Sequence, residues 1–398
     1  MSEPLDPESK LNPERAKGKS VSRREFLGAL GVSSAGVLLG ACSRAKSPVG
    51  PAATESIAGS AATAMRHPMK FDGALAKVAT ADVSTYDYQA LRQNIESMFN
   101  ALGGISDIAG GKTVGIKVNL TGGSGSANTT PPAVELYWTH PEITRVVGEL
   151  VKDAGASKIY IIEAIYDWKS YNSYGFKDAA DYLGAELIDL NQKTPYADFV
   201  ERPVGPNWLI YEKFTQCGLL NDIDCVISLP KTKQHKGAGY TNGMKNFIGS
   251  VPLSIYGPGG NSRQLLHSHR TEFEQNWMSN LRRVVLDLNM ATKVHLTVAD
   301  AIKTALGSEG PWNRNEYKLV PTAFNKLIAS KDVVAADSVS CQVIGFDPMV
   351  ADDTGVFKDG INYLRLAQEK GMGIYDLSQI EVVDATVSTG IRERQPLS

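Results

Sequence analysis

Apolar runs without polar interruption alternate with segments of helical periodicity along most of the chain. Such runs are typical of strands buried on both faces, and the periodic segments are typical of helices packed against them. Strands are predicted at residues 113–119, 158–162, 186–189, 224–229, 294–298 and 326–329, and helices at residues 139–155, 176–183, 273–289 and 332–344. This alternation predicts an α/β protein with a mostly parallel sheet flanked by helices, built as one elaborated domain or as two interleaved lobes.

The N-terminal region follows a different pattern. Arg23 and Arg24 form a twin-arginine motif, and an uncharged run rich in Gly, Ala and Ser follows up to Ser43. The run reaches the minimum length of a membrane anchor, but its glycines weaken both helicity and transfer into lipid. We therefore expect a twin-arginine (Tat) signal peptide over residues 1–42, and export to the periplasmic side through the Tat translocase.

The signal ends in a sequence that is typical of a lipobox, with small residues before Cys42. Lipidation of Cys42 would anchor the mature chain to a membrane surface without spanning the membrane. The alternative is ordinary cleavage beside a cysteine that is there by chance. Residues 43–68, rich in Ala, Ser and Pro, are predicted to form a flexible tether, and residues 69–398 to form the folded domain.

Charge and cysteine content narrow the classes of function. The chain has 398 residues, with 41 Lys+Arg against 43 Asp+Glu, so bulk positive charge is not available for binding nucleic acid. The four cysteines contain no C-x-x-C pair, which argues against a built-in iron–sulfur or zinc cluster. In an oxidising compartment, Cys217, Cys225 and Cys341 are expected to be buried or to include one bridged pair.

Polar residues gather where two predicted strands end. Lys117 and Asn119 lead into a Gly/Ser-rich loop, which is either an anion cradle or a plain loop. The strand at 224–229 leads into a stretch with four lysines and one histidine within 15 residues, and its candidate ligand-binding and catalytic residues are Lys231, Lys233, His235, Lys245 and Asn246. Gly, Asn and Thr between these residues favour anion recognition over a solvated basic turn.

Three further features are candidates for chemistry. His267 and His269 have the H-x-H spacing that can ligate a metal when both lie on a strand, although paired surface histidines are the commoner explanation. Asp300 is predicted to follow directly after a strand, where a carboxylate can hold a lysine or a metal, act as a base, or cap a turn. Asp337 lies among apolar residues of a predicted helix and needs a partner if it is buried.

Several ordered motifs make residues 110–350 similar to the family of domain of unknown function 362 (DUF362). They include the stretches 117–119, 230–235, 245–249, 298–302, 309–311, 330–337 and 344–348. The resemblance marks a shared site without assigning roles, at Lys117, Asn119, Lys231, His235, Lys245, Asn246, Asp300, Gly310 and Asp337. Many relatives resemble fusions to ferredoxin-type modules, whose cysteine runs this chain lacks, so a redox role would need an external electron donor.

Three hypotheses follow. The leading one is an exported enzyme for a small anionic substrate, a carboxylate or a phosphate ester, with lysines as anion ligands and His235 as proton donor or acceptor. Asp300 and Asp337 would orient a lysine or hold a divalent cation. The second is a metal-dependent or redox enzyme with His235, His267 and His269 beside Asp300, and the third is a non-catalytic lipoprotein that captures a ligand. The leading hypothesis requires these side chains to meet in one pocket.

Overall fold

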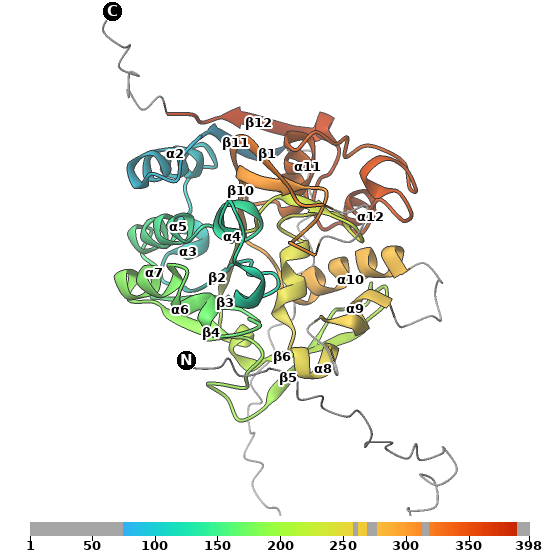
Figure 1. The fold of residues 1–398 in the computed structure, drawn as a ribbon, viewed down its shortest axis with the longest axis horizontal. Coiled ribbons are helices and arrows are strands. Elements are labelled where there is room, and N and C mark those ends of the chain that lie inside the picture. The colour runs from blue at the N-terminus through green and yellow to red at the C-terminus, as the bar shows by residue number, and fades with distance from the viewer. Residues whose placement is uncertain (1–74, 258–261, 269–276, 313–317, 388–398) are drawn as a thin grey trace, which may run out of the picture. The chain divides into compact units, whose positions relative to one another are not determined.

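The computed structural model describes residues 75–387, except 258–261, 269–276 and 313–317. The predicted signal peptide, the tether and Cys42 lie outside the described residues, as does His269. Within the described part, no helix is long and apolar enough to cross a membrane. Figure 1 shows the fold.

The described residues contain twelve strands. The strands are β1 (Ala76–Asp82), β2 (Thr113–Lys117), β3 (Lys158–Glu163), β4 (Glu186–Asp189), β5 (Phe199–Pro203), β6 (Lys213–Cys217), β7 (Cys225–Ser228), β8 (Lys233–His235), β9 (Gly239–Thr241), β10 (Leu296–Leu306), β11 (Val320–Ser330) and β12 (Ile380–Asp384). Eight of them form one sheet in the order β12-β1-β11-β10-β7-β2-β3-β4. β11 is antiparallel to both of its neighbours and the other pairings are parallel, which confirms the mostly parallel α/β sheet.

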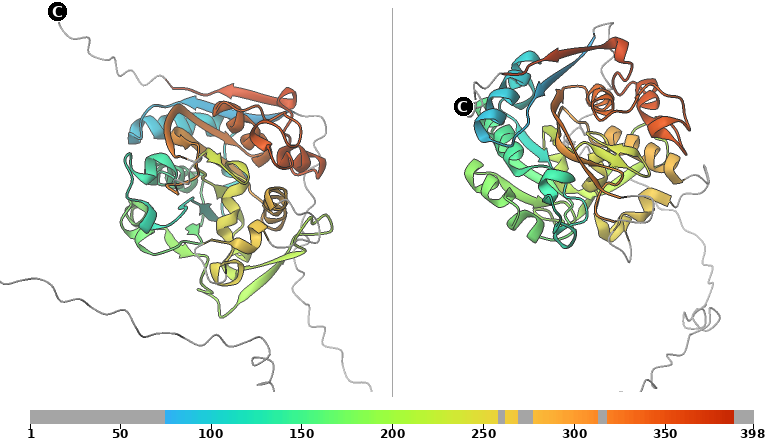
Figure 2. Two further views of the ribbon diagram at one scale, coloured as in Figure 1. Left: turned by 45° about the vertical axis from the view of Figure 1, so that its right-hand side comes forward. Right: turned by 45° about the horizontal axis from the view of Figure 1, so that its top comes forward.

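Helices cover both faces of this sheet. They are α2 (Tyr88–Ala101), α3 (Ser106–Ala109), α4 (Ala133–Leu136), α5 (Pro141–Asp153), α6 (Lys169–Asn172), α7 (Phe176–Leu183), α8 (Leu253–Tyr256), α9 (Gln264–Ser268), α10 (Trp277–Ala291), α11 (Val333–Val343) and α12 (Tyr363–Glu369). α2, α5 and α7 share a hydrophobic core with one face, and α10, α11 and α12 pack against the other (Figure 1). In the right-hand view of Figure 2 the two groups lie on opposite sides of the strands.

Alternating strand residues supply both cores. In β3, Ile159 and Ile161 face the core on the α5 side, whereas Tyr160 and Ile162 belong to the core on the α10 side. A strand covered on both faces has no need of polar positions, which explains its uninterrupted apolar run. Cys225 packs in the core on the α5 side. Cys217, Cys225 and Cys341 are all buried and form no disulfide bond, which is one of the two outcomes expected.

The structure corrects two local predictions. The helix predicted at residues 139–155 begins at Pro141, and the side chain of His140 caps it, because its Nδ1 accepts a hydrogen bond from the backbone N–H of Glu142. Thr139 accepts from the N–H of Asn119 and donates to the carbonyl of Leu229, which ties together the chain segments that follow β2 and β7. Asp300 does not follow a strand but lies inside β10, which is longer than its apolar run suggested.

Candidate functional site

A cavity of about 590 Å³ lies beyond the carboxyl ends of β2 and β3, the position at which open α/β sheets collect ligands. It is lined by Asn119, Leu120, Thr121, Gly122, Ser126, Glu163, Tyr166, His235, Lys236, Thr241, Lys245, Asn246, Ile248, Gly249, Ser262, Arg263, His267, Ser308, Glu309 and Trp312. Asn119, His235, Lys245 and Asn246 were predicted as site residues, so part of the predicted set does meet at one cavity.

Lys245 is the first residue of the 3₁₀ helix Lys245–Ser250, which forms one wall of the cavity. Only 8% of the residue is exposed, and within the described part of the chain its ammonium makes no hydrogen bond or ion pair. Burial lowers the pKa of Lys245 to about 8, against the attraction of Glu309 and with the repulsion of Arg263. A buried cation without a partner in the described part of the chain favours the binding of an anionic ligand.

His235 ends β8 and lines the same cavity. Its Nδ1 accepts hydrogen bonds from the backbone N–H groups of Gly237 (3.0 Å) and Ala238 (3.2 Å), so the neutral ring carries its proton on Nε2. Burial, and next the charge of Lys245, lower the pKa of His235 well below its ordinary value. The ring is therefore a neutral donor at physiological pH.

Arg263 supplies a second buried cation. Its Nε donates to the carbonyl of Val251 (2.7 Å) and its Nη2 to that of Ala164 (2.8 Å). The guanidinium also lies 5.8 Å from the centre of the Tyr166 ring. These contacts fix the orientation of the side chain, and a guanidinium keeps its charge even where burial lowers its pKa.

Lys117 and Glu163 form a fully buried ion pair at the sheet end of the cavity, with 2.7 Å between Nζ and Oε2. Burial lowers the pKa of Lys117 and raises that of Glu163, and their mutual attraction opposes both shifts. Gly249 lies directly over the pair, where a Cβ atom would collide with the carboxylate. Because Glu163 is paired, the remaining charges of the lining, with three basic side chains and the carboxylate of Glu309, make the cavity positive.

Lys233 stands behind the cavity wall. Its ammonium is fully buried and donates to Asn119 Oδ1 (2.8 Å), Thr121 Oγ1 (3.2 Å) and the carbonyl of Tyr137. Asn119 in turn donates to Asn246 Oδ1 (3.2 Å). This network places the two amides against the cavity and leaves Lys233 itself occupied by three oxygen atoms.

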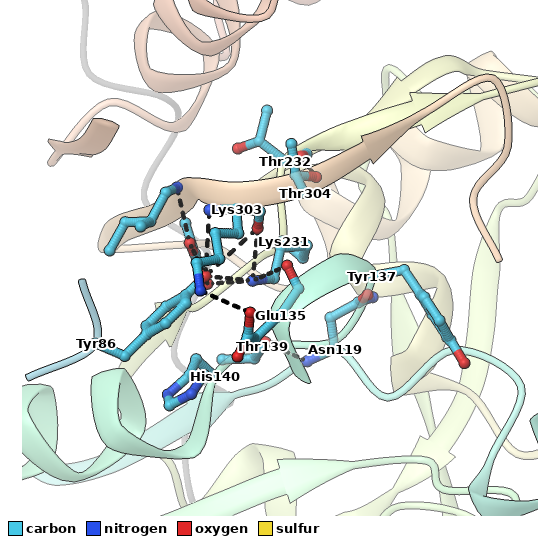
Figure 3. Close-up of polar contacts among 12 residues, drawn as sticks. Tyr86, Asn119, Glu135, Tyr137, Thr139, His140, Lys231, Thr232, Lys303 and Thr304 are labelled. Carbon is cyan, nitrogen blue, oxygen red and sulfur yellow. Dashed lines mark hydrogen bonds and ion pairs between the residues drawn. The ribbon is translucent and has the colours of Figure 1, made fainter. Parts of the chain in front are cut away.

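Lys231 and Asp300 lie in a separate cluster that does not line the cavity. The ammonium and the carboxylate are both buried and 2.5 Å apart, and the Tyr86 hydroxyl contacts both. Lys231 also donates to the carbonyl of Lys303 (3.1 Å), and Figure 3 shows Tyr86, Glu135 and Lys303 gathered around it. Burial lowers the pKa of Lys231 and raises that of Asp300, against the attraction between them.

Asp337 is buried in α11, and its carboxylate accepts hydrogen bonds from Asn242 Nδ2 (2.9 Å) and from the backbone N–H of Met244 (3.2 Å). Burial raises its pKa to about 7. The partner that this acid needed is therefore the chain segment just before Lys245. Through that segment, Asp337 positions Lys245 without lining the cavity.

The two remaining predicted features have different surroundings. Gly310 packs its backbone against the Trp312 ring, with which a Cβ atom at Gly310 would collide. His267 lines the cavity from helix α9 rather than from a strand, and its predicted partner His269 lies outside the described residues. Its Nδ1 is 2.8 Å from the carbonyl of Arg263, and burial lowers its pKa to about 4. Among the described residues, no group of three His, Cys, Asp or Glu side chains is arranged to hold a metal ion.

Sequence reasoning missed several lining residues, which are Glu163, Tyr166, Arg263, Glu309 and Trp312. Glu163 could have been found, because it directly follows the predicted strand at 158–162 and so lies at a carboxyl end. No local signal singles out Arg263, since its role depends on carbonyl groups of two distant segments.

Comparison with known proteins agrees with the ordered motifs. Residues 114–342 match the model of the family described as domain of unknown function (DUF362), and the chain belongs to this family. A thylakoid-associated protein of Synechocystis sp. is 24% identical over 267 residues, which is 66% of this chain and 73% of that protein.

Two solved structures share part of the fold. The lactate racemase apoprotein of Thermoanaerobacterium thermosaccharolyticum matches 69% of this chain, with a TM-score of 0.40 and 12% identity. A protein of Thermotoga maritima matches 65%, with a TM-score of 0.36 and 9% identity. This chain spans 58% of the length of each of them.

Proposed function

We propose that this protein binds a small anionic molecule, a carboxylate or a phosphate ester, in the cavity around Lys245, and that it acts on that molecule as an enzyme. The observation that carries the proposal is the buried ammonium of Lys245, which faces the cavity without a partner among the described residues. An anionic ligand supplies the missing counter-charge, and a charge-assisted hydrogen bond to a carboxylate or phosphate oxygen is among the strong ones.

The surroundings of Lys245 favour a negatively charged ligand over a neutral one. Arg263 and Lys236 add positive charge to the lining, and Lys117 cancels the charge of Glu163. Asn119 and Asn246 add amide groups that suit the polar parts of a small ligand. His235, a neutral ring with its proton on Nε2, can donate a hydrogen bond to a reacting oxygen, and this supports an enzyme over a protein that only captures a ligand.

The test is calorimetric binding of oxalate and of inorganic phosphate to the mature chain. Lys245→Met should weaken binding of the better probe by roughly 10–100-fold, the loss of one charge-assisted hydrogen bond. The control is Lys213→Met, which removes an exposed lysine outside the cavity lining and should change the affinity by less than about threefold. Equal effects of the two substitutions, or no binding of either probe, would contradict the proposal.

The proposal includes the place of action. Residues 1–42 direct the folded chain through the Tat translocase, and lipidated Cys42 holds it at a membrane surface on the periplasmic side. Support comes from the twin-arginine motif and the lipobox sequence. Cys42→Ser should abolish incorporation of labelled palmitate, and replacement of Arg23 and Arg24 by Lys should keep the chain in the cytoplasm. Export of the doubly substituted chain would refute the Tat route.

A further inference from the structure

Lys245 differs from the other buried lysines of the described chain in having no oxygen partner. Lys117 and Lys231 are paired with carboxylates, and Lys233 is held by three oxygen atoms. In each of these three lysines, the surrounding oxygen atoms bind the protonated amine. They therefore disfavour the free amine, whose lone pair is the nucleophile. Only the amine of Lys245 faces an open cavity, so it is the one that can react with a ligand.

The chemistry of lysine separates this position from a plain anion site. A site that needs only positive charge is served by arginine, which keeps its charge and fixes its donors in a plane. Lysine in a shielded, cationic environment loses its proton more easily and becomes a nucleophile. With a pKa of about 8, roughly a tenth of the Lys245 side chains are free amines at pH 7.

We propose that Lys245 forms an imine with the carbonyl group of an α-keto acid, whose carboxylate binds in the same positive cavity. This assignment rests on the proposed anion site and names its substrate class. The cavity provides the two features that such a ligand needs: a reactive amine at Lys245 and a second fixed cation at Arg263.

The reaction needs no oxidant or reductant. The lone pair of Lys245 Nζ forms a bond to the carbonyl carbon, and the electron pair of the C=O bond moves to oxygen, which takes up a proton. Loss of one proton from nitrogen gives a neutral carbinolamine. Nitrogen then expels the hydroxyl group, which leaves as water after taking a second proton, and the C=N bond forms. Water relays the proton lost from nitrogen to the departing oxygen and supplies the second proton. His235 Nε2–H lies in the lining and can donate a hydrogen bond to that oxygen while it keeps its own proton.

The test uses glyoxylate and pyruvate as probes and sodium cyanoborohydride to reduce any imine to a stable secondary amine. After digestion, mass spectrometry of the full mature chain should place a carboxymethyl or carboxyethyl group on Lys245. We expect labelling of Lys245 to be at least about tenfold faster than that of Lys213, an exposed lysine outside the lining. Burial lowers the pKa of Lys245, whereas the hydrogen bond to Glu201 raises the pKa of Lys213. Oxalate, which binds as an anion without an electrophilic keto group, should slow the labelling.

Two variants complete the test. Lys245→Arg keeps the charge but removes the nucleophile, so it should retain oxalate binding and lose the adduct. Lys213→Arg, outside the lining, should retain both. If oxalate or inorganic phosphate binds wild type in a Lys245-dependent manner and neither keto acid labels Lys245 faster than Lys213, the imine is refuted and the anion site stands. If oxalate, inorganic phosphate and both keto acids all fail to bind or react, the proposed function falls with it.

Discussion

Lys231 and Lys245 lie fourteen positions apart in the same basic stretch, yet the fold gives them opposite surroundings. The ammonium of Lys231 has four oxygen partners in the protein, which are a carboxylate oxygen of Asp300, the Tyr86 hydroxyl and the backbone carbonyls of Glu135 and Lys303. Figure 3 shows Tyr86, Glu135 and Lys303 around Lys231. Lys245 faces a cavity without such a partner among the described residues. Lys231 therefore stabilises the folded state, whereas the charge of Lys245 is available to bind a ligand.

The comparison also explains why the stretch contains so many cations in a chain of nearly balanced charge. Lys231 and Lys233 donate to the carbonyls of Glu135 and Tyr137, and so hold the segment around α4 against the strands. Lys233 also donates to Asn119 and Thr121, which line the cavity. Lys233 thus positions part of the cavity wall and Lys231 stabilises the neighbouring segment, while neither lysine lines the cavity itself.

The largest expected effect is on the Lys231 side. Asp300→Asn leaves a fully buried ammonium without its carboxylate, which should lower the free energy of unfolding by about 3–5 kcal/mol. Urea unfolding of the purified variant measures this loss. The control is the double variant Lys231→Met/Asp300→Leu, which removes both charges and should recover most of the stability. A loss below about 1 kcal/mol in the single variant would mean that the Lys231–Asp300 pair is not important for the stability of the folded state.

An intermediate effect is expected from Asp337, which connects α11 to the segment before Lys245. Burial raises its pKa from 3.8 to about 7, so between these values the folded chain holds a proton that the unfolded chain has released. Unfolding free energy should therefore fall as pH rises through this window, by at most about 1.4 kcal/mol per pH unit from this group.

Asp337→Asn removes that titration, and the slope of unfolding free energy against pH should become shallower between about pH 4 and pH 7. Urea titrations at several pH values give the slope for each chain. Asp376→Asn is a suitable control, because hydrogen bonds from Ser378 lower the pKa of this carboxyl instead of raising it, so it does not contribute to the expected fall in stability. Identical slopes for wild type and Asp337→Asn would show that Asp337 is not buried as an acid.

The smallest effect is expected at Lys245. Lys245→Met removes a buried ammonium that makes no hydrogen bond within the described chain, so unfolding free energy should stay within about 1 kcal/mol of wild type or rise. The same urea measurement used for Asp300→Asn tests this. A loss of unfolding free energy as large as that of Asp300→Asn would mean that Lys245, like Lys231, stabilises the folded state.

The sequence predicted more of the fold than of the site. Apolar runs located β3, β4 and β7, and helical periodicity located α5, α7 and α11, because each of these patterns is local. β1 and β12 were missed, and they form one edge of the sheet. β12 is buried on few of its residues, so it lacks the continuous apolar run of an inner strand.

The single pocket expected from the basic stretch was found only in part. His235, Lys245, Asn119 and Asn246 line one cavity, whereas Lys231 with Asp300, and Asp337, belong to separate buried clusters. Spacing along the chain does not distinguish these cases. Lys231 and Lys245 both follow strands or turns near the same edge of the sheet. The surroundings of each ammonium depend on which residues the fold places next to it.

From sequence alone came the α/β class, the resemblance to the family to which the chain belongs, and the residue types of the site, because these depend on periodicity and on ordered local motifs. Tertiary structure decided which charges are neutralised. Lys231 meets Asp300 across 69 positions and Lys117 meets Glu163 across 46, whereas Lys245 meets a cavity. The free energy of a buried charge depends on its partners in space, and it is the tertiary structure that brings partners distant in sequence together.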